Sequence, residues 1–296
     1  MPFFRDENSS VHYLERGRGE AVLLIHGLGC SGAAWAFQVA ALQRHFRVIV
    51  PDLPGSGHSS APRDGHSIEG YAATMWKFLD HLKIDKVNLV GFSLGGAVCQ
   101  EMAVARPAAV QRLSLINSLA TYRPHSLRKL FETYFSSTLV RMLGMPRSAT
   151  FMAARLFPES WQSAIRDHAA AALGGVPAPA YLGMGFALAR WAILDRLEGL
   201  SCSIMLIAAE KDFTPLEEKI ALAEQLRAHL VVVRGSRHAT PFDAVEITNA
   251  CLSAFLKDEP LPEPSRWVCD SALRTSGLSI AGSIADEHAL SPLLPD

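Results

Sequence analysis

The sequence predicts an α/β protein with a doubly wound, mostly parallel sheet. The first observation is that short, continuously apolar runs alternate with longer segments of helical periodicity. In a parallel sheet, helices cover both faces, so the strands are apolar throughout rather than at every second position. The second observation is the repeated order of strand and helix along 296 residues, which is long enough for one large domain.

Each expected element follows from one of these runs. The apolar runs, for example AVLLIH and KVNLVG, predict buried strands at 21–26, 47–51, 86–91, 113–117, 204–209 and 230–234. The periodic segments between them predict helices, among them 68–82, 94–105 and 217–228. Residues 11–15 predict an antiparallel edge strand.

One segment interrupts the alternation. The stretch between the strands at 113–117 and 204–209 is far longer than one crossover needs, and it is rich in Leu, Met, Phe and Trp. We expect a helical cap at 121–199, inserted into a core formed by 1–120 and 200–257, with a turn at 174–179. Three prolines open the segment 258–296, which we expect to be a peripheral or disordered tail.

Composition excludes several classes of protein. The net charge of −1 gives no footprint for nucleic acid, and no apolar run approaches the ~20 residues of a membrane span. Five cysteines without a CxxC pair argue against a disulfide framework and a zinc site. No signal peptide is recognisable at the start, so we expect a cytoplasmic protein. The oligomeric state is left open.

The clearest motif is Gly91-Phe92-Ser93-Leu94-Gly95, which matches G-x-S-x-G. It follows an apolar strand and opens a helix, which is the setting that this motif requires. Such a sharp turn forces Ser93 toward a positive φ and leaves no room for a Cβ at 91 or 95. The turn would present the Ser93 hydroxyl at a helix N-terminus, where negative charge is favoured. Ser93 is therefore the candidate nucleophile.

The chain resembles the α/β-hydrolase family over about residues 10 to 257. The resemblance rests on His26-Gly27-Leu28-Gly29, on the segment 52–59, on the turn around Ser93, and on the segments of the base and the acid. It implies an α/β-hydrolase fold, a serine nucleophile, and the chain order Ser, acid, His.

A serine hydroxyl needs a general base, and the base needs a carboxylate that orients it. His238 lies just after the last expected strand, at the carboxyl end of the sheet, where such sheets bind ligands. Asp212 follows the strand at 204–209, with Glu210 as a nearby rival. The family resemblance favours Asp212, and the alternative family position for the acid reads Asn117-Ser118, without a carboxylate.

The resemblance also implies the remaining parts of the site. The backbone N–H groups of Leu28 and Leu94 are the expected oxyanion donors. We assign His26, Gly27 and Phe92 to the substrate-binding wall, and expect His26 to brace its loop through hydrogen bonds. The segment 52–59, with Asp52 and His58, is expected to shape a loop beside the site.

The sequence thus predicts a serine hydrolase that cleaves an ester or related acyl bond of a small hydrophobic molecule, with neither a metal nor an organic cofactor. Similar sequences also imply C–C bond hydrolases, lactonases, and cofactor-free haloperoxidases or perhydrolases. Residues 121–195 carry eight Lys and Arg against four Asp and Glu. An arginine such as Arg190 could therefore bind a substrate carboxylate, although a solvated basic surface is the plainer explanation. A hydrolase-like ligand receptor is the alternative without catalysis.

Overall fold

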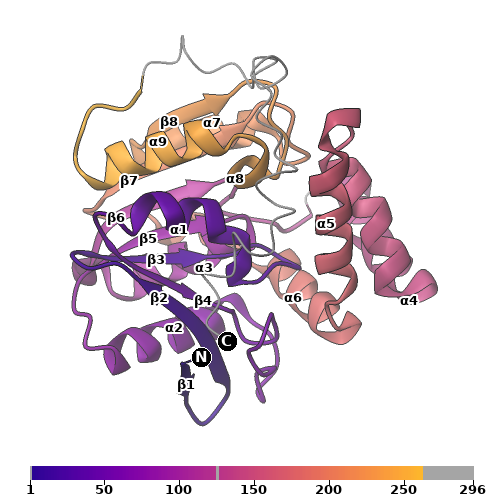
Figure 1. Ribbon diagram of the computed structural model, residues 1–296, viewed down its shortest axis with the longest axis horizontal. Helices are drawn as coiled ribbons and strands as arrows, with labels where there is room; N and C mark the ends of the chain where they lie inside the picture. Colours follow the sequence, from indigo (N-terminus) through magenta and orange to yellow (C-terminus); the bar gives the residue numbers. More distant parts are fainter. Residues whose placement is uncertain (1, 125–126, 263–296) are drawn as a thin grey trace.

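The computed structural model describes residues 2–124 and 127–262, and the side chains of these residues apart from 127–133. Its centre is an eight-stranded sheet with the order β1-β2-β4-β3-β5-β6-β7-β8 (Figure 1). The strands are β1 (Phe3–Arg5), β2 (Ser10–Arg16), β3 (Ala21–Ile25), β4 (Arg47–Pro51), β5 (Val87–Phe92), β6 (Val110–Ile116), β7 (Ser203–Ala209) and β8 (His229–Val233).

The pairing confirms the predicted fold class. The first two pairs, β1 with β2 and β2 with β4, are antiparallel. All later neighbours in the sheet pair in parallel. The expected edge strand at 11–15 is part of β2, and β1 extends this edge by one short strand that the sequence did not predict.

Helices cover both faces of the sheet. They are α1 (Ala36–Leu42), α2 (Ile68–His81), α3 (Leu94–Ala105), α7 (Leu216–Leu226), α8 (Thr240–Asp243) and α9 (Val245–Leu256). Strand β3 shows why the strands are continuously apolar. Its Val22 and Leu24 belong to a core that includes residues of α1 and α9, whereas Leu23 and Ile25 belong to a second core with α2, α3 and α7. Both faces of one strand are thus buried.

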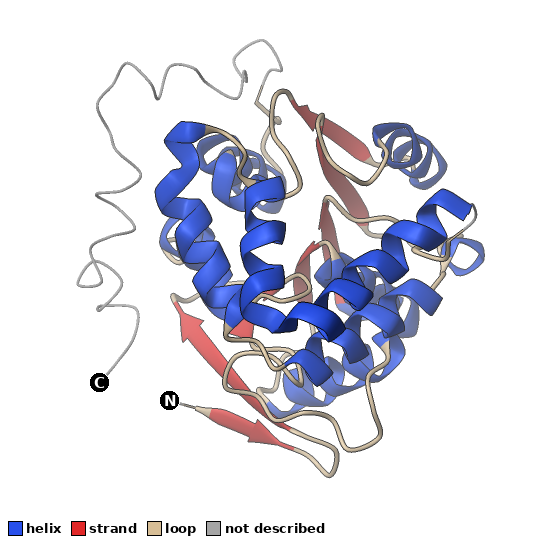
Figure 2. Ribbon diagram, turned by 90° about the vertical axis from the view of Figure 1, so that its right-hand side faces the viewer, coloured by secondary structure: helices blue, strands red, loops and turns tan. Residues whose placement is uncertain are grey.

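The long segment between β6 and β7 forms a separate group of helices: α4 (Leu127–Leu156), α5 (Ser163–Gly174) and α6 (Ala178–Arg190). Figure 1 shows α4 and α5 side by side beyond one end of the sheet, and Figure 2 turns this group toward the viewer. Helix α4 is bent at Gly144, where the backbone takes a φ of 74° and a ψ of 168°. The expected turn at 174–179 coincides with the junction between α5 and α6.

The inserted helices pack on loops at the carboxyl ends of the strands. A Cβ added at Gly29, after β3, would lie 2.4 Å from Leu173 Cδ1 of α5. A Cβ at Gly55, after β4, would lie 3.3 Å from the terminal methyl of Met184 of α6. The helices therefore lie over the end of the sheet where parallel α/β folds bind their ligands.

The two ends of the insertion meet. Thr121 and Ala192 form an isolated antiparallel bridge, and Ile193 N–H donates to Ala120 O at 2.9 Å. This pairing supports the limits that we propose for the two parts of the chain. The cap is 121–199, and the core consists of 1–120 and 200–257. The proposed tail, 258–296, falls outside the described residues from 263 onward.

No single helix within 2–124 and 127–262 is long and apolar enough to cross a membrane. In this described part of the chain, one pair of helices, Ser160–Gly174 and Ala178–Arg190, passes the test of length and composition when taken together, and the two are bent by 97° relative to each other.

Candidate active site

Ser93 occupies the sharp turn between β5 and α3 and has the expected positive φ, 52°. The neighbouring glycines make this turn sterically allowed. A Cβ at Gly91 would lie 2.4 Å from Gly95 O, and a Cβ at Gly95 would lie 2.1 Å from Ile25 O. Both would strike backbone atoms, which cannot move aside. The turn predicted from the sequence is therefore present, with its strained residue at the position of the candidate nucleophile.

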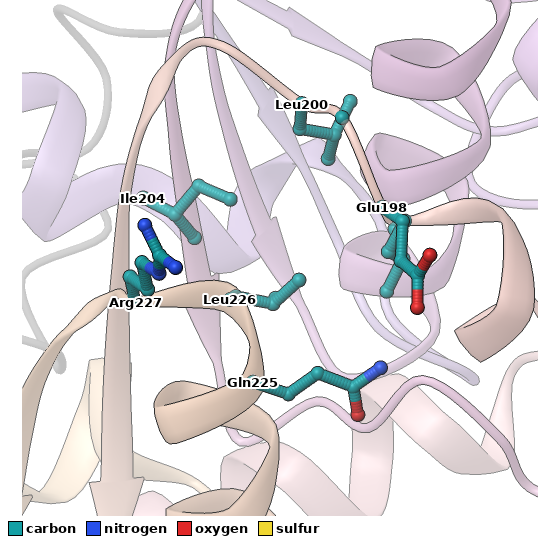
Figure 3. Close-up of a pocket in the computed structure, with 8 residues that line it drawn as sticks. Glu198, Leu200, Ile204, Gln225, Leu226 and Arg227 are labelled. Carbon is teal, nitrogen blue, oxygen red and sulfur yellow. The ribbon is translucent and has the colours of Figure 1, made fainter.

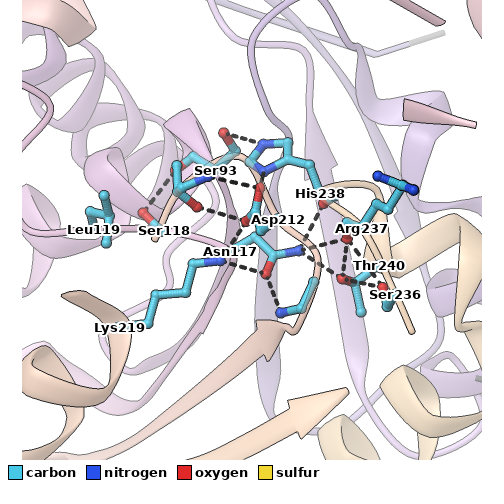
Figure 4. Close-up of polar contacts among 12 residues, drawn as sticks. Ser93, Asn117, Ser118, Leu119, Asp212, Lys219, Ser236, Arg237, His238 and Thr240 are labelled. Atoms are coloured by element: carbon cyan, nitrogen blue, oxygen red, sulfur yellow. Dashed lines mark hydrogen bonds and ion pairs between the residues drawn. The ribbon is translucent and has the colours of Figure 1, made fainter. Parts of the chain in front are cut away.

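Three residues far apart in the sequence form a continuous hydrogen-bonded chain (Figure 4). His238 Nε2 lies 2.9 Å from Ser93 Oγ, and His238 Nδ1 lies 2.8 Å from Asp212 Oδ1. His238 comes from the loop between β8 and α8, and Asp212 from the loop that follows β7. With the Nδ1 proton donated to the carboxylate, Nε2 is free to accept the proton of the serine hydroxyl.

The three hydrogen-bonded residues are largely shielded from solvent. Ser93 and His238 are buried, and the side chain of Asp212 is fully buried. Aromatic rings cover the imidazole, with ring centroids 5.2 Å away for Phe92 and 4.1 Å away for Phe213. Exclusion of water strengthens the electrostatic interactions among the three groups.

The carboxylate of Asp212 is saturated with donors. Beyond His238, Thr214 donates through its N–H at 3.2 Å and its Oγ1 at 2.7 Å, and Lys219 Nζ lies 2.5 Å from Oδ2. Burial alone would raise the pKa of Asp212, but the charges and hydrogen bonds of His238 and Lys219 outweigh burial and hold that pKa well below its usual range. Asp212 is therefore ionised at neutral pH.

Asn117 ties the acid and base loops together. Its backbone is in the left-handed region, with φ 47°, directly after β6. Its Nδ2 donates to His238 O at 2.8 Å and to Thr240 Oγ1 at 2.7 Å, while its Oδ1 accepts from Ala209 N at 2.7 Å. The alternative family position for the acid thus holds an amide that fixes the loop of His238 to the end of β7.

Two backbone amides are available for an oxyanion. Among the described residues, no acceptor takes a hydrogen bond from the N–H of Leu28 or of Leu94, which is the first residue of α3. The Leu94 amide has no partner because the first N–H groups of a helix lack intrahelical acceptors. Both predicted donors are thus free to bind an anion.

His26 braces the loop that carries Leu28, as expected. Its Nδ1 donates to Gly27 O at 2.9 Å, and its Nε2 accepts from Leu53 N at 3.0 Å. The ring is fully buried, and burial lowers its pKa, so the imidazole stays neutral. Since both ring nitrogens are used, His26 shapes the proposed substrate wall from behind.

The other two residues assigned to the substrate wall lie against each other. A Cβ at Gly27 would be 3.0 Å from the Phe92 ring, so the glycine provides the space that this ring fills. Phe92 in turn contacts the ring of His238. Gly27, Phe92 and His238 therefore lie in a row of contacts, and a role of His26, Gly27 and Phe92 in substrate binding stays a prediction.

Glu210 and Asp52, the other carboxylates near the site in the sequence, bind partners other than His238. Glu210 Oε2 accepts from Gly235 N at 2.8 Å, on the surface and away from His238. Asp52 accepts from Gly32 N at 2.7 Å, from His58 N at 2.9 Å and from His12 Nδ1 at 2.8 Å. These bonds hold the loops after β3 and β4, in agreement with the predicted loop-shaping role of the segment 52–59.

Sequence reasoning missed several residues of the site. Lys219 reads as an ordinary surface lysine in a helix, and Phe213 as an ordinary loop residue. Tyr122 at the start of the insertion was also missed. Its hydroxyl donates to Ser118 Oγ at 3.4 Å, and burial raises its pKa to about 12. Lys219 lies in the first turn of α7, whereas Asp212 lies in the loop before this helix, so no helical spacing in the sequence connects the two residues.

A pocket of about 270 Å³ lies away from the hydrogen-bonded residues (Figure 3). It is lined by Leu197, Glu198, Gly199, Leu200, Ile204, Gln225, Leu226 and Arg227. Ile204 stands at the amino end of β7, whereas Asp212 follows the carboxyl end. The pocket is therefore remote from Ser93 and contributes nothing to the hydrogen-bonded chain.

The described part of the chain contains no group of three or more His, Cys, Asp or Glu side chains placed to hold a metal ion. Cys30, Cys99, Cys202 and Cys251 are free thiols, and Cys269 lies outside the described residues. A reaction without metal or cofactor stays a prediction from the sequence.

The family model of the α/β hydrolase fold matches residues 20–243. The chain belongs to this family. Two curated relatives match nearly their whole length. The putative carbamate hydrolase RutD of Pseudomonas syringae pv. syringae is 31% identical over 260 residues, covering 84% of this chain and 98% of that protein. The (E)-2-((N-methylformamido)methylene)succinate hydrolase of Acinetobacter baylyi is 26% identical over 265 residues, covering 86% and 96%.

Solved structures of other α/β hydrolases superpose closely. A thermophilic esterase from Thermogutta terrifontis, with malate bound, gives a TM-score of 0.76 at 25% identity and covers 84% of this chain and 94% of its own. The enol-lactonase of Burkholderia xenovorans gives 0.79 at 23% identity, with 86% and 100% covered, and this likeness shows the fold. These relatives indicate a hydrolase, and they differ in the bond that they cleave.

Proposed function

We propose that this α/β hydrolase cleaves an ester or related acyl bond of a small hydrophobic substrate, with Ser93 as nucleophile, His238 as general base and Asp212 as the orienting acid. The observation that carries the proposal is the chain of two hydrogen bonds, 2.9 Å from Ser93 to His238 and 2.8 Å from His238 to Asp212. A nucleophile bonded to a base that is itself oriented by a carboxylate is the arrangement that acyl transfer requires.

The proposed reaction has two halves. In the first, the Ser93 proton passes to His238 Nε2 while Oγ attacks the acyl carbonyl, and the alcohol departs with that proton. In the second, His238 takes a proton from water, the resulting hydroxide attacks the acyl-enzyme, and the acid is released as Ser93 is protonated again. Each tetrahedral intermediate would place its oxyanion at the free amides of Leu28 and Leu94.

The first test is a panel of p-nitrophenyl esters, from acetate to dodecanoate, with wild type and Ser93→Ala side by side. We expect turnover by the wild type alone, while both proteins unfold at the same temperature. An active Ser93→Ala protein would contradict the assignment of the nucleophile. The chain length that is hydrolysed best measures the room for the acyl group.

A second candidate is hydrolysis of a carboxylate-bearing substrate. The Acinetobacter relative is named for a succinate derivative, and the Thermogutta esterase holds malate. The segment 121–195, which contains the helices over the site, has eight Lys and Arg against four Asp and Glu. Arg123 and Arg190 are exposed at the two ends of this segment, where Arg123 Nε donates to Arg190 O at 2.7 Å.

A matched pair of substrates separates the two candidates. The monomethyl ester of succinate carries a free carboxylate, and dimethyl succinate does not. A kcat/KM at least about tenfold higher for the monoester would favour the carboxylate-bearing class. The reverse preference would favour neutral esters. Turnover of neither, with Ser93 still labelled by a fluorophosphonate, would direct the search to carbamate, C–C or lactone substrates, or to a perhydrolase. Labelling of Ser93 without turnover of any of these further substrate classes would favour a ligand receptor.

A further inference from the structure

A lysine ammonium is buried against the candidate acid. Lys219, in the first turns of α7, has a side chain that is only 1% exposed. Its Nζ lies 2.5 Å from Asp212 Oδ2 and 3.3 Å from Asn117 Oδ1. A buried ammonium is costly unless it is paired, and removal of one partner leaves an uncompensated charge. Burial lowers the pKa of Lys219, and the Asp212 carboxylate opposes this effect.

The two oxygens of Asp212 have different partners (Figure 4). Oδ1 accepts from the imidazole of His238, while Oδ2 accepts from Lys219 and from Thr214 Oγ1. The ammonium therefore sits on the side of the carboxylate that faces away from the base. Lys219 and His238 thus hold opposite oxygens of the carboxylate, with Thr214 donating to both, and of these residues only His238 takes part in the proposed proton transfer.

We propose that Lys219 is a positioning residue that fixes Asp212 and sets the lower limit of the pH range in which His238 acts as a base. This inference rests on the proposed serine-hydrolase function. With the ammonium in place, the charge of Asp212 is already balanced, so the carboxylate stabilises an imidazolium less than an unpaired carboxylate would. Removal of the ammonium would leave that charge unbalanced beside the imidazole, so the pH dependence of the reaction should change.

Other ionisable groups surround the pair. They are Glu218 beside Lys219, Asp243 of α8, Arg237 before His238, and Tyr122 at the start of the insertion. Asp243 accepts from Ser236 Oγ at 2.7 Å and from Arg237 N at 3.1 Å, and burial raises its pKa. The Tyr122 hydroxyl is neutral throughout the working range, because burial raises its pKa to about 12. The direct ion pair of Lys219 is with Asp212.

The test compares Lys219→Met, which removes the charge at similar length, with Lys219→Arg, which keeps it. Lys257→Met, at the end of α9, is the control for loss of a lysine elsewhere. Two rates are followed against pH: kcat/KM for p-nitrophenyl acetate, and labelling of Ser93 by phenylmethylsulfonyl fluoride, read by intact mass. We expect the midpoint of the acid limb to rise by about one pH unit in Lys219→Met, and to stay at the wild-type value in the other two variants.

A purely structural role for Lys219 would give a different result. It would lower the melting temperature and the plateau rate of Lys219→Met but leave the acid limb where it is in the wild type, and this outcome would overturn the inference. If Lys219→Met does not fold, Lys219→Gln, which keeps a donor for Asp212 without the charge, must show the same rise. The labelling rate separates the two proposals: a wild type without turnover or labelling refutes the function, whereas a labelled protein with an unmoved limb refutes only the role of Lys219.

Discussion

The ring of Phe213 lies against the imidazole of His238, with 4.1 Å between the centroids and 35° between the planes, although Phe213 itself is 63% exposed. A large aromatic side chain that is open to solvent contributes little to stability at that site. Its position, next to Asp212 in sequence and over the base in space, is therefore better explained by the reaction. We expect the ring to shield the imidazole from water and to offer an apolar surface to a substrate.

Replacement of this ring should affect activity and spare stability. We expect Phe213→Ala to lower kcat/KM for hydrophobic esters about three- to tenfold, the value of one aromatic contact, with the unfolding free energy changed by less than about 0.5 kcal/mol. Steady-state kinetics and urea unfolding measure the two effects. Met142→Ala, at another exposed apolar side chain, is the control and should change neither. Unchanged kinetics in Phe213→Ala would remove the ring from the substrate site.

Asp212→Asn should combine a kinetic and a structural defect. The amide cannot hold His238 in the required tautomer, so we expect kcat/KM to fall by about a thousandfold or more. Lys219 would also lose its counter-charge, which should reduce the unfolding free energy by about 3 kcal/mol. The rival acid provides the control, since Glu210→Gln keeps an acceptor for Gly235 N and should behave as wild type. A large loss of activity in Glu210→Gln would mean that the wrong acid had been chosen.

Gly95→Ala tests the steric argument for the turn. The added Cβ would stand 2.1 Å from Ile25 O, a backbone atom of β3, so the strand or the helix must shift. We expect a loss of about 3 kcal/mol or more in unfolding free energy, seen as a lower melting temperature or as insoluble protein. Gly185→Ala is the matched control in α6, because its nearest atom, Leu28 Cδ2, would be 3.8 Å away. There we expect a gain of up to about 1 kcal/mol from helix propensity.

His26 should make folding stability depend on pH. Burial lowers its folded-state pKa, so the unfolded chain binds this proton more readily than the folded protein. Stability from this group is present above the unfolded pKa of about 6.5 and is lost as the pH falls below it, by up to about 1.4 kcal/mol per pH unit.

The measurement is urea unfolding at about pH 7.5 and about pH 5 for wild type and His26→Gln. The variant should be less stable at the higher pH, since the bonds to Gly27 O and Leu53 N are weakened. Its stability should also fall less on acidification than that of the wild type. Equal slopes for the two proteins would show that another group is responsible.

The sequence was most informative where a local rule suffices. Continuous apolar runs locate the buried strands, because two helical layers leave no polar face. The turn at Ser93 follows from its glycines. His238 and Asp212 both lie after strand ends, and the family resemblance is what favours Asp212 over Glu210. Lys219 could not be found this way. A lysine in an amphipathic helix is normally solvated, and its burial here depends on Asp212 and Asn117, which lie after the ends of β7 and β6.

Elements with weak local signals were missed for similar reasons. Strand β1 has three residues and is held only by pairing with β2, so its sequence carries no period to detect. Helix α1 has a similarly weak signal, because its seven residues give barely two turns of periodicity. The bend in α4 comes from Gly144, which lies two residues before Pro146 and could have been recognised as a helix breaker.

The bridge between Thr121 and Ala192 has a consequence for how this protein can diverge. Because the two ends of the insertion are paired, all the helices between them form one long loop whose ends are held close together. The entropic cost of such a loop grows only slowly with its length. Residues between these two positions can therefore be lengthened, shortened or transplanted from a relative with little change in strand register, so that new substrates can be acquired while the proton-transfer machinery is inherited intact.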